Sequence, residues 1–310
     1  MLFLGLLTLL QLHAPDPKPW IHRVEIVGDT VWFQGDRGYD SVRVRYCFAR
    51  RTGAWCRLPR PDPGGSAVGQ VPRRPPDSVG LAAGLTLVCH PPAGSGVDCE
   101  QFGVRIADDP RVWPLVPQAD AATLAMLQKA AHLETDDPPT ISEFVTAWAA
   151  ADDAVWFGLG GGFPEGQGAY GGLLRFDRAR KAVETVVHAR LADATVTGLA
   201  IDGGTLWIGT LHPSEFGPVG STGVLRRDLR TGRWAALDSA GRHLPDKVIQ
   251  AVAAKDGAVF IATRDGLAAF DTRTSRWSVR YFHRTSISGS VAHVLAAARP
   301  RDYPNRRRPH

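Results

Sequence analysis

Two long polar loops in the second half of the sequence combine aromatic rings with ionisable side chains. The six residues are Phe163, Glu165 and Tyr170 in the first loop and His212, Glu215 and Phe216 in the second. Aromatic rings can stack on the apolar face of a sugar, while carboxylates accept hydrogen bonds from hydroxyl or amide groups. This combination suits recognition of a carbohydrate or a peptide. The alternative is that these side chains only hold flexible loops in place.

The same loops offer weaker support for catalysis. Glu165 and Glu215 could serve as the acid and base of a glycoside hydrolase, but their separation in sequence establishes no distance in space. The histidines have no short metal-ligand spacing, and no Gly-x-Ser-x-Gly motif supplies a nucleophile. The glycine-rich segment 158–172 lacks the Lys-Ser/Thr ending of a phosphate-binding loop. We therefore expect no metal and no cofactor.

The four cysteines form two closely spaced pairs, which is typical of an oxidising compartment. Cys47 and Cys56 are equidistant from a turn, so a hairpin would place them opposite each other. Cys89 and Cys99 similarly flank a loop rich in proline and glycine. Neither pair has the Cys-x-x-Cys spacing of a zinc or redox site. We expect two disulfides, with buried free thiols as the alternative.

The N-terminus has an apolar run from Leu2 to Leu12, which is the length of a signal-peptide core and too short to span a bilayer. No Lys or Arg precedes the run, and Pro15 follows the small residue Ala14. Residues 1–17 are predicted to be a signal peptide, either cleaved or kept as an anchor. The protein is then expected in the periplasm or outside the cell, without a membrane span.

The charge pattern gives no evidence for a nucleic-acid partner. The formal net charge is +5, and a dense basic cluster occurs only in the tail at 299–310. No nucleic-acid-binding motif accompanies this charge, so a solvated tail explains it. We expect a monomer.

The elements that position the two loops belong to an internal repeat. Segments 145–159, 196–210 and 248–263 each contain an apolar run, a polar turn and a second apolar run with an aromatic residue. Each continues into a second hairpin, at 172–186, 223–237 and 266–282. The repeating unit thus has four strands, and it must stack on its neighbours to bury both faces.

A radial stack of such sheets predicts an all-β fold, a β-propeller with about five four-stranded blades and a partial sixth. The predicted domain spans 20–298, with a short helical insertion at 120–133 whose Leu124, Leu127 and Ala131 pack on the propeller. The predicted blades cover 20–58, 79–117, 143–187, 195–237 and 247–282, with the partial blade at 290–298.

The sequence GGTLWIGT at 203–210, followed by a strand and TGRW at 231–234, resembles the two-component regulator propeller family. The resemblance covers 145–282 well and 20–117 weakly. It implies an exported sensing domain that recognises an extracellular ligand, often a carbohydrate. The chain shows neither a second hydrophobic segment nor a kinase, so a stand-alone secreted propeller is expected.

Strand alternation within each blade divides the loops between two faces. Short regular turns collect on one face, and the long insertions, including both aromatic loops, collect on the other. We predict an exported, non-catalytic, sensor-like propeller that binds a carbohydrate, peptide or exported protein through its loop-rich face. A lyase or glycoside hydrolase using His212, Glu165 and Glu215 is one alternative. A structural scaffold for other exported proteins is the other.

Overall fold

The chain was analysed as a computed structural model. It describes residues 19–37, 42–56, 78–82, 84–89, 102–131, 140–161, 169–214, 220, 223–237 and 243–282.

Five antiparallel four-stranded sheets make up the molecule, here called sheets 1 to 5 in chain order. Sheet 1 contains β1 (Pro19–Val27), β2 (Thr30–Arg37), β3 (Val42–Ala49) and β4 (Ala54–Trp55). Sheet 2 contains β5 (Ser78–Ala82), β6 (Leu85–Cys89), β7 (Phe102–Ile106) and β8 (Asp109–Pro114). Sheet 3 contains β9 (Val145–Ala150), β10 (Ala154–Leu159), β11 (Leu173–Asp177) and β12 (Ala182–Val186).

The last two sheets follow the same plan. Sheet 4 contains β13 (Thr195–Asp202), β14 (Thr205–Leu211), β15 (Val224–Asp228) and β16 (Trp234–Leu237). Sheet 5 contains β17 (Ile249–Lys255), β18 (Ala258–Thr263), β19 (Gly266–Asp271) and β20 (Arg276–Tyr281). In all five, each strand pairs with the next along the chain, which confirms the predicted four-stranded unit and agrees with a propeller-like fold. The segment 290–298, predicted as a partial sixth blade, lies outside the described residues.

Local turn chemistry explains the first hairpin of these units. Asp202 pairs with Thr205 around Gly203 and Gly204, whose φ angles are 55° and 75°. In sheet 5, Asp256 and Gly257 occupy the same two positions with φ angles of 54° and 82°. A two-residue hairpin with positive φ at both positions matches the twist of the flanking strands, and Gly and Asp tolerate this conformation best.

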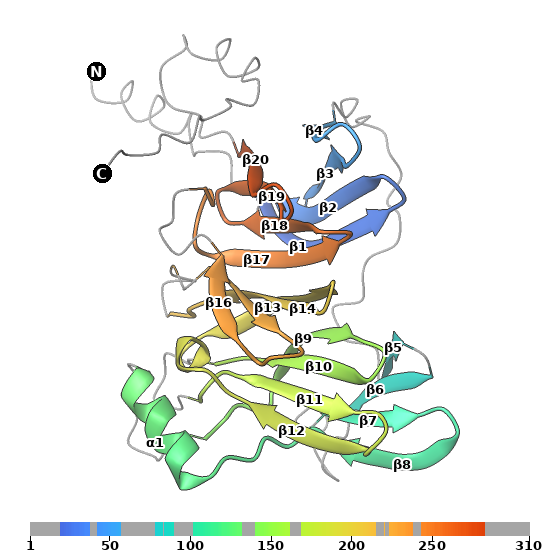
Figure 1. Cartoon of the computed structure of the whole chain (residues 1–310), viewed down its shortest axis with the longest axis vertical. Coiled ribbons are helices and arrows are strands. Elements are labelled where there is room, and N and C mark those ends of the chain that lie inside the picture. Colours follow the sequence, from blue (N-terminus) through green and yellow to red (C-terminus); the bar gives the residue numbers. More distant parts are fainter. Residues whose placement is uncertain are drawn as a thin grey trace, which may run out of the picture.

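Neighbouring sheets meet through their first strands, in the order β5, β9, β13, β17 and β1. Sheet 1, at the N-terminal end of the described chain, therefore packs on sheet 5 at the C-terminal end (Figure 1). The Oγ1 of Thr146 donates to the carbonyl of Val196 at 2.6 Å, linking β9 to β13. Gln250 makes the corresponding link from β17 to β1, because its Oε1 accepts from the backbone N–H of Ile21 at 2.8 Å.

Side-chain burial follows this order of packing. Every residue of β10, in sheet 3, is buried. In sheet 1, Val31 and Phe33 face sheet 5 and are fully buried, whereas Trp32 and Gln34 on the other face are half-buried. Sheet 3 therefore contributes apolar side chains to the packing on both sides, and sheet 1 has one apolar face and one mixed face.

The insertion between sheets 2 and 3 forms the helix α1 (Ala121–Ala130), as predicted. Asp120 caps it by accepting the backbone N–H of Thr123 at 2.7 Å, which satisfies one of the free amides of the first turn. Leu127 is fully buried in the core shared by sheets 2 and 3, and Leu124 and Ala131 pack against the same core. The predicted apolar stripe is therefore used for packing.

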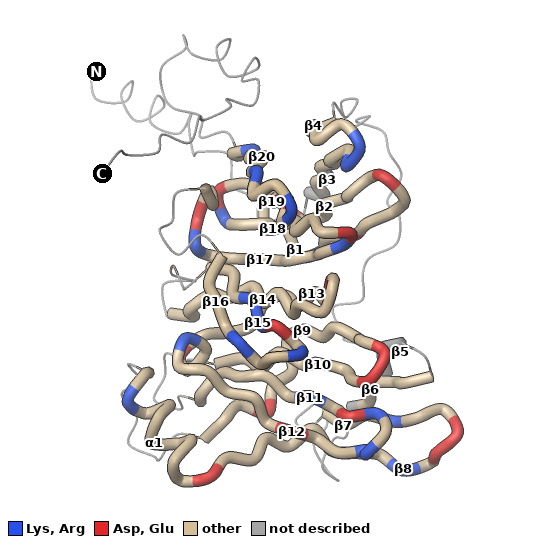
Figure 2. Tube along the Cα trace, viewed as in Figure 1, with Lys and Arg blue, Asp and Glu red and all other residues tan. Residues whose placement is uncertain are grey.

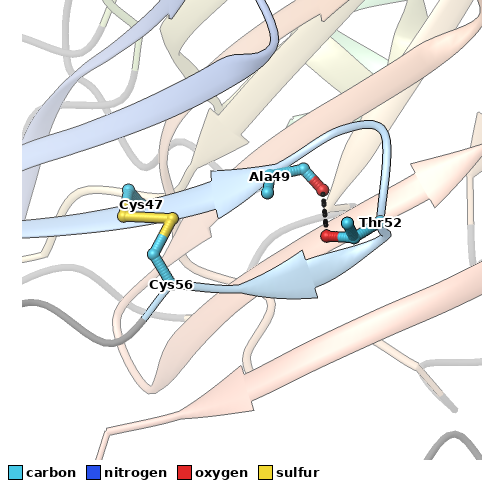
Figure 3. Close-up of a disulfide and its surroundings, with 4 residues drawn as sticks. All are labelled: Cys47, Ala49, Thr52 and Cys56. Carbon is cyan, nitrogen blue, oxygen red and sulfur yellow. Dashed lines mark hydrogen bonds between the residues drawn. A yellow bond between two sulfur atoms is a disulfide. The ribbon is translucent and has the colours of Figure 1, made fainter.

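A disulfide joins Cys47 at the end of β3 to Cys56 after β4 (Figure 3), as predicted. Their Cα atoms are 5.3 Å apart, and the N–H of Cys56 donates to the carbonyl of Cys47 at 2.9 Å. The turn between them is closed by the Thr52 hydroxyl, which donates to the carbonyl of Ala49 at 3.4 Å. The side chain of Cys89, and all of Cys99, lie outside the described part of the structure.

Among the described residues, none of the helices has both the length and the apolar character that crossing a bilayer would require.

Candidate functional site

The strands divide the connections between two ends of the sheets, which we call the turn side and the loop side. The turn side carries tight hairpins such as 203–204 between β13 and β14 and 256–257 between β17 and β18. The loop side carries the long connections, including 115–144 and 160–172. All six predicted ligand-contacting residues come from connections on the loop side.

Of those six residues, the structure describes Tyr170 and His212. The other four lie outside the described residues: Phe163, Glu165, Glu215 and Phe216.

Tyr170 is a core residue rather than a surface one. Its exposed fraction is 1%, and its ring belongs to the core shared by sheets 2 and 3. Its backbone donates to the carbonyl of Thr140 at 2.8 Å and accepts from the N–H of Ser142 at 2.9 Å. Burial raises the pKa of Tyr170. The ring of Tyr170 thus packs at the base of the loop.

His212 stands at the loop-side end of β14, where its Nδ1 lies 3.3 Å from Oδ2 of Asp193. The two side chains are 23% and 20% exposed, so the pair is shielded but reachable from solvent. Asp193 was not singled out from the sequence. It follows the short 3-10 helix η1 (Ala189–Leu191), and no motif links it to His212. Asp193 lies two residues before Thr195, which pairs with Leu211 next to His212, so the antiparallel pairing of β13 with β14 brings the two groups together.

A second aromatic feature on the loop side was also missed. Phe144 directly precedes β9, and its side chain is 57% exposed. Its ring lies 6.4 Å from that of Phe102 at an interplanar angle of 68°, an edge-to-face arrangement. The carbonyl of Phe144 accepts from the N–H of Gly160 at 2.9 Å, which fixes the backbone beneath the ring. Because Phe144 directly precedes the apolar strand β9, the sequence alone does not distinguish it from a buried strand residue.

The base of the first aromatic loop is held by close backbone packing. The hydroxyl of Thr195 donates to the carbonyl of Gly161 at 2.9 Å, and the N–H of Gly171 donates to the carbonyl of Ala192 at 3.0 Å. A Cβ on Gly171 would meet the carbonyl oxygens of Ala194 and Leu191. The loop therefore leaves and re-enters the sheet at a fixed position, which is what a loop-borne binding site needs.

His188 connects this region to sheet 4 through a stacked contact. Its ring lies 4.6 Å from that of Trp234 at an interplanar angle of 29°, and its Nδ1 accepts from the N–H of Arg190 at 3.2 Å. Burial, and secondarily the charge of Arg190, lowers the pKa of His188. The guanidinium of Arg227 also lies near Trp234, at 5.7 Å from the ring centroid. The folded state thus favours the neutral imidazole.

This pKa shift predicts a pH-dependent stability. The unfolded chain binds a proton at the ordinary histidine pKa of about 6.5, above the folded pKa, so stability should fall as pH drops below about 6.5. The variant His188→Asn keeps a side-chain acceptor for Arg190 without a titrating group. Thermal melts at pH values above and below this range should show a smaller acid-induced loss in His188→Asn than in the native chain. Equal losses in the two proteins would contradict the assignment.

Charged residues on the turn side are engaged in ion pairs. Basic and acidic residues lie next to one another along the strand ends (Figure 2). Arg175 contacts Asp153 at 2.8 Å, Asp177 at 3.0 Å and Glu184 at 3.2 Å. Burial is the largest single influence and lowers the pKa of Arg175, but the hydrogen bonds that its guanidinium donates to these carboxylates outweigh it, so the pKa is raised. The charges of Arg175 and these three carboxylates are structural, because each of them has a partner.

No group of three or more His, Cys, Asp or Glu side chains that could hold a metal ion occurs within the described ranges.

Comparison with known proteins gives distant similarities only. No protein-family model matches the chain, and no curated protein sequence matches it. One similar structure is the extracellular domain of a one-component system from B. thetaiotaomicron, with 15% identity and a TM-score of 0.38, covering 79% of this chain and 26% of that one. Another is the extracellular domain of a hybrid two-component system from the same organism, with 14% identity, a TM-score of 0.38 and coverage of 79% and 26%.

The N-terminal domain of Nup159 is also similar, with 14% identity, a TM-score of 0.33 and coverage of 64% of this chain and 41% of that one. The chain spans about a quarter of the length of the two extracellular domains. TM-scores this low leave the function to be argued from the geometry of the molecule itself.

Proposed function

We propose that this protein is an exported, non-catalytic, sensor-like β-propeller that binds a carbohydrate, peptide or protein partner through its loop side. Under this proposal the five sheets are blades of one propeller domain at 20–298, a sixth blade begins at 290–298, and the protein works as a monomer. The likeness of segment 203–210 to the two-component regulator propeller repeat supports the blade assignment.

The observation that carries the proposal is the unequal use of the two ends of the sheets. The turn side is closed by tight hairpins and ion pairs, whereas the loop side gathers long connections on a rigid base. Within those connections, Phe144 is 57% exposed, and His212 is paired with Asp193 but still 23% exposed. Function concentrates where variable loops are held by a rigid scaffold.

Export is supported by the disulfide between Cys47 and Cys56. Disulfides persist in the periplasm and outside the cell, whereas cytosolic thiols are kept reduced. Both locations suit a protein that meets external ligands.

A binding screen with thermal-shift detection tests the proposed loop-side site. Purified chain is screened against oligosaccharides and peptides, because a ligand that binds only the folded state raises the unfolding temperature. A selective shift should be lost in Phe144→Ala and His212→Ala, and should persist in the control variant Val27→Ala, which truncates a 58% exposed residue at the turn-side end of β1. A shift that survives both loop-side substitutions would contradict the proposed site.

A second candidate function rests on the His212–Asp193 pair. A carboxylate at Nδ1 orients an imidazole so that its Nε2 can transfer a proton, which is the arrangement of a general base. A lyase or hydrolase using the loop side would need this pair. Product formation from any oligosaccharide in the screen, abolished in His212→Gln, would favour the enzyme, whereas binding without turnover favours the sensor-like function.

A further inference from the structure

The first strands of four sheets line an open cavity of about 410 Å³ near the turn side, at the opposite end of these strands from the loop side. It is lined by consecutive residues of β9, β13 and β17 and by Val24 and Ile26 of β1. Cavities that bind small molecules typically have volumes of about 300–1,000 Å³. Neither Tyr170 nor His212, the two described residues among the six predicted from the sequence, lines it, and its position near the turn side separates it from the proposed loop-side site.

Trp148 is the single aromatic residue of the lining, and its side chain is 40% exposed. The repeat places Leu199, Val252 and Val24 at the equivalent positions of β13, β17 and β1, and the first two are only 8% exposed. A leucine or valine side chain is therefore large enough to fill the space at this position between neighbouring sheets. A half-exposed tryptophan in their place leaves an aromatic surface open to a ligand in the cavity.

The cavity walls around Trp148 consist of small aliphatic side chains and the edges of strands. Five alanines line the cavity, which keeps space open beside the tryptophan: Ala149, Ala150, Ala200, Ala253 and Ala254. Each of the four first strands is also the edge strand of its sheet, so backbone N–H and C=O groups that have no partner strand border the cavity. The site thus joins a ring-sized apolar space to backbone hydrogen-bonding groups.

Lys255 is the one charged residue in the lining. The neighbouring Asp256 is already paired with Arg50 at 2.6 Å, and this contact, more than Lys255, lowers the pKa of Asp256. The carboxylate of Asp202 accepts the N–H groups of Asp256 at 2.9 Å and of Gly257 at 2.6 Å.

On β1, the side chain of Glu25 is bound by Arg23 at 3.0 Å and by Gln34 at 3.1 Å. These three carboxylates, which adjoin lining residues in the sequence, thus have partners of their own, and Lys255 contributes a positive charge that suits an anionic ligand.

We propose that this cavity binds a small ring-bearing carboxylate, with the ring against Trp148 and the carboxylate paired with Lys255. Two kinds of ring share the chemistry that the cavity recognises: a ring with hydroxyl groups, as in a sugar acid, and a plain hydrocarbon ring. Hydroxyl groups would use the free strand edges, and a hydrocarbon ring would use the alanine walls.

Calorimetry and saturation-transfer NMR on the full chain test the proposal with four probes: glucuronate, glucose, cyclohexanecarboxylate and cyclohexylmethanol. At least one carboxylate should bind about tenfold more tightly than its neutral counterpart, because a charge-assisted hydrogen bond to Lys255 is lost in the neutral molecule. The carboxylate that binds identifies the kind of ring. Absence of binding by both carboxylates, or equal binding of the charged and neutral probes, would overturn the proposal.

Matched substitutions locate the binding. Trp148→Leu installs the residue found at the equivalent position of β13 and should weaken binding about fivefold. Trp20→Leu removes a tryptophan of similar exposure, 43%, that does not line the cavity, and should leave binding unchanged. Lys255→Met should remove the preference for the carboxylate, while Lys129→Met on α1 should keep it. Unchanged affinity in Trp148→Leu, with an unchanged melting temperature, would place any observed binding elsewhere.

Discussion

Replacing Gly171 by alanine should lower the free energy of unfolding by about 1–3 kcal/mol, because the new methyl group has no room in a close-packed region. A Cβ at this position would meet the backbone carbonyl oxygens of Ala194 and Leu191. Backbone cannot move aside as the end of a flexible side chain can. The residues beneath the first aromatic loop would have to separate, so the loop itself would be displaced.

The neighbouring glycine supplies the control for this prediction. A Cβ on Gly172 would find its nearest atoms at 3.6 Å, on Val186 and Val187, which is ordinary van der Waals contact. Gly172→Ala should therefore change the free energy of unfolding by less than about 0.5 kcal/mol. Denaturant unfolding of both variants measures the difference. Equal stability of the two would show that the loop base is not packed as closely as described.

Replacing Gln250 by leucine should cost about 1–3 kcal/mol, because it leaves the buried backbone N–H of Ile21 without an acceptor. Gln250 is 5% exposed, so water does not readily replace the lost partner. This hydrogen bond joins β17 to β1 and thus ties the C-terminal sheet to the N-terminal one. Phe48 of β3 and Phe260 of β18, with ring centroids 5.8 Å apart, pack across the same junction.

Thr197→Val is the matched control, since Thr197 occupies the position equivalent to Gln250 in the preceding sheet. Its hydroxyl donates to the carbonyl of Ile249 at 2.8 Å, and its loss should cost about 0.5–1.5 kcal/mol. Hydrogen exchange separates the two effects. In Gln250→Leu the amides of β1 should exchange faster, and in Thr197→Val they should not. Unchanged exchange in β1 would contradict the role given to Gln250.

The repeating unit could be predicted because its signals are local. The alternation of the strands and the Gly203-Gly204 and Asp256-Gly257 turns specify hairpins through backbone conformations that few residues adopt. The same holds for α1, where Asp120 precedes an apolar stripe. The disulfide between Cys47 and Cys56 followed from hairpin symmetry, which is also a local property.

The candidate sites could be predicted only in part, because they depend on contacts between distant segments. The aromatic loops were identified by their composition. Composition does not determine which ring is buried, and the ring of Tyr170 lies in the core. His212 was selected, but Asp193 was not, since its approach depends on the register in which β13 pairs with β14. In the sequence, Trp148 is one residue of an apolar strand. Only the convergence of four sheets places it beside the cavity.

The sequence by itself determined the strands, the tight turns, the helix cap and the division into short and long connections, because each depends on residues a few positions apart. The tertiary structure decided that sheet 1 packs on sheet 5, and that a cavity with Trp148 and Lys255 opens where β1, β9, β13 and β17 converge. Apolar sheet faces are similar in every repeat, so the hydrophobic effect favours stacking but does not specify which two sheets pack together. Specific contacts, such as the hydrogen bond between Gln250 and Ile21, determine which sheets are neighbours.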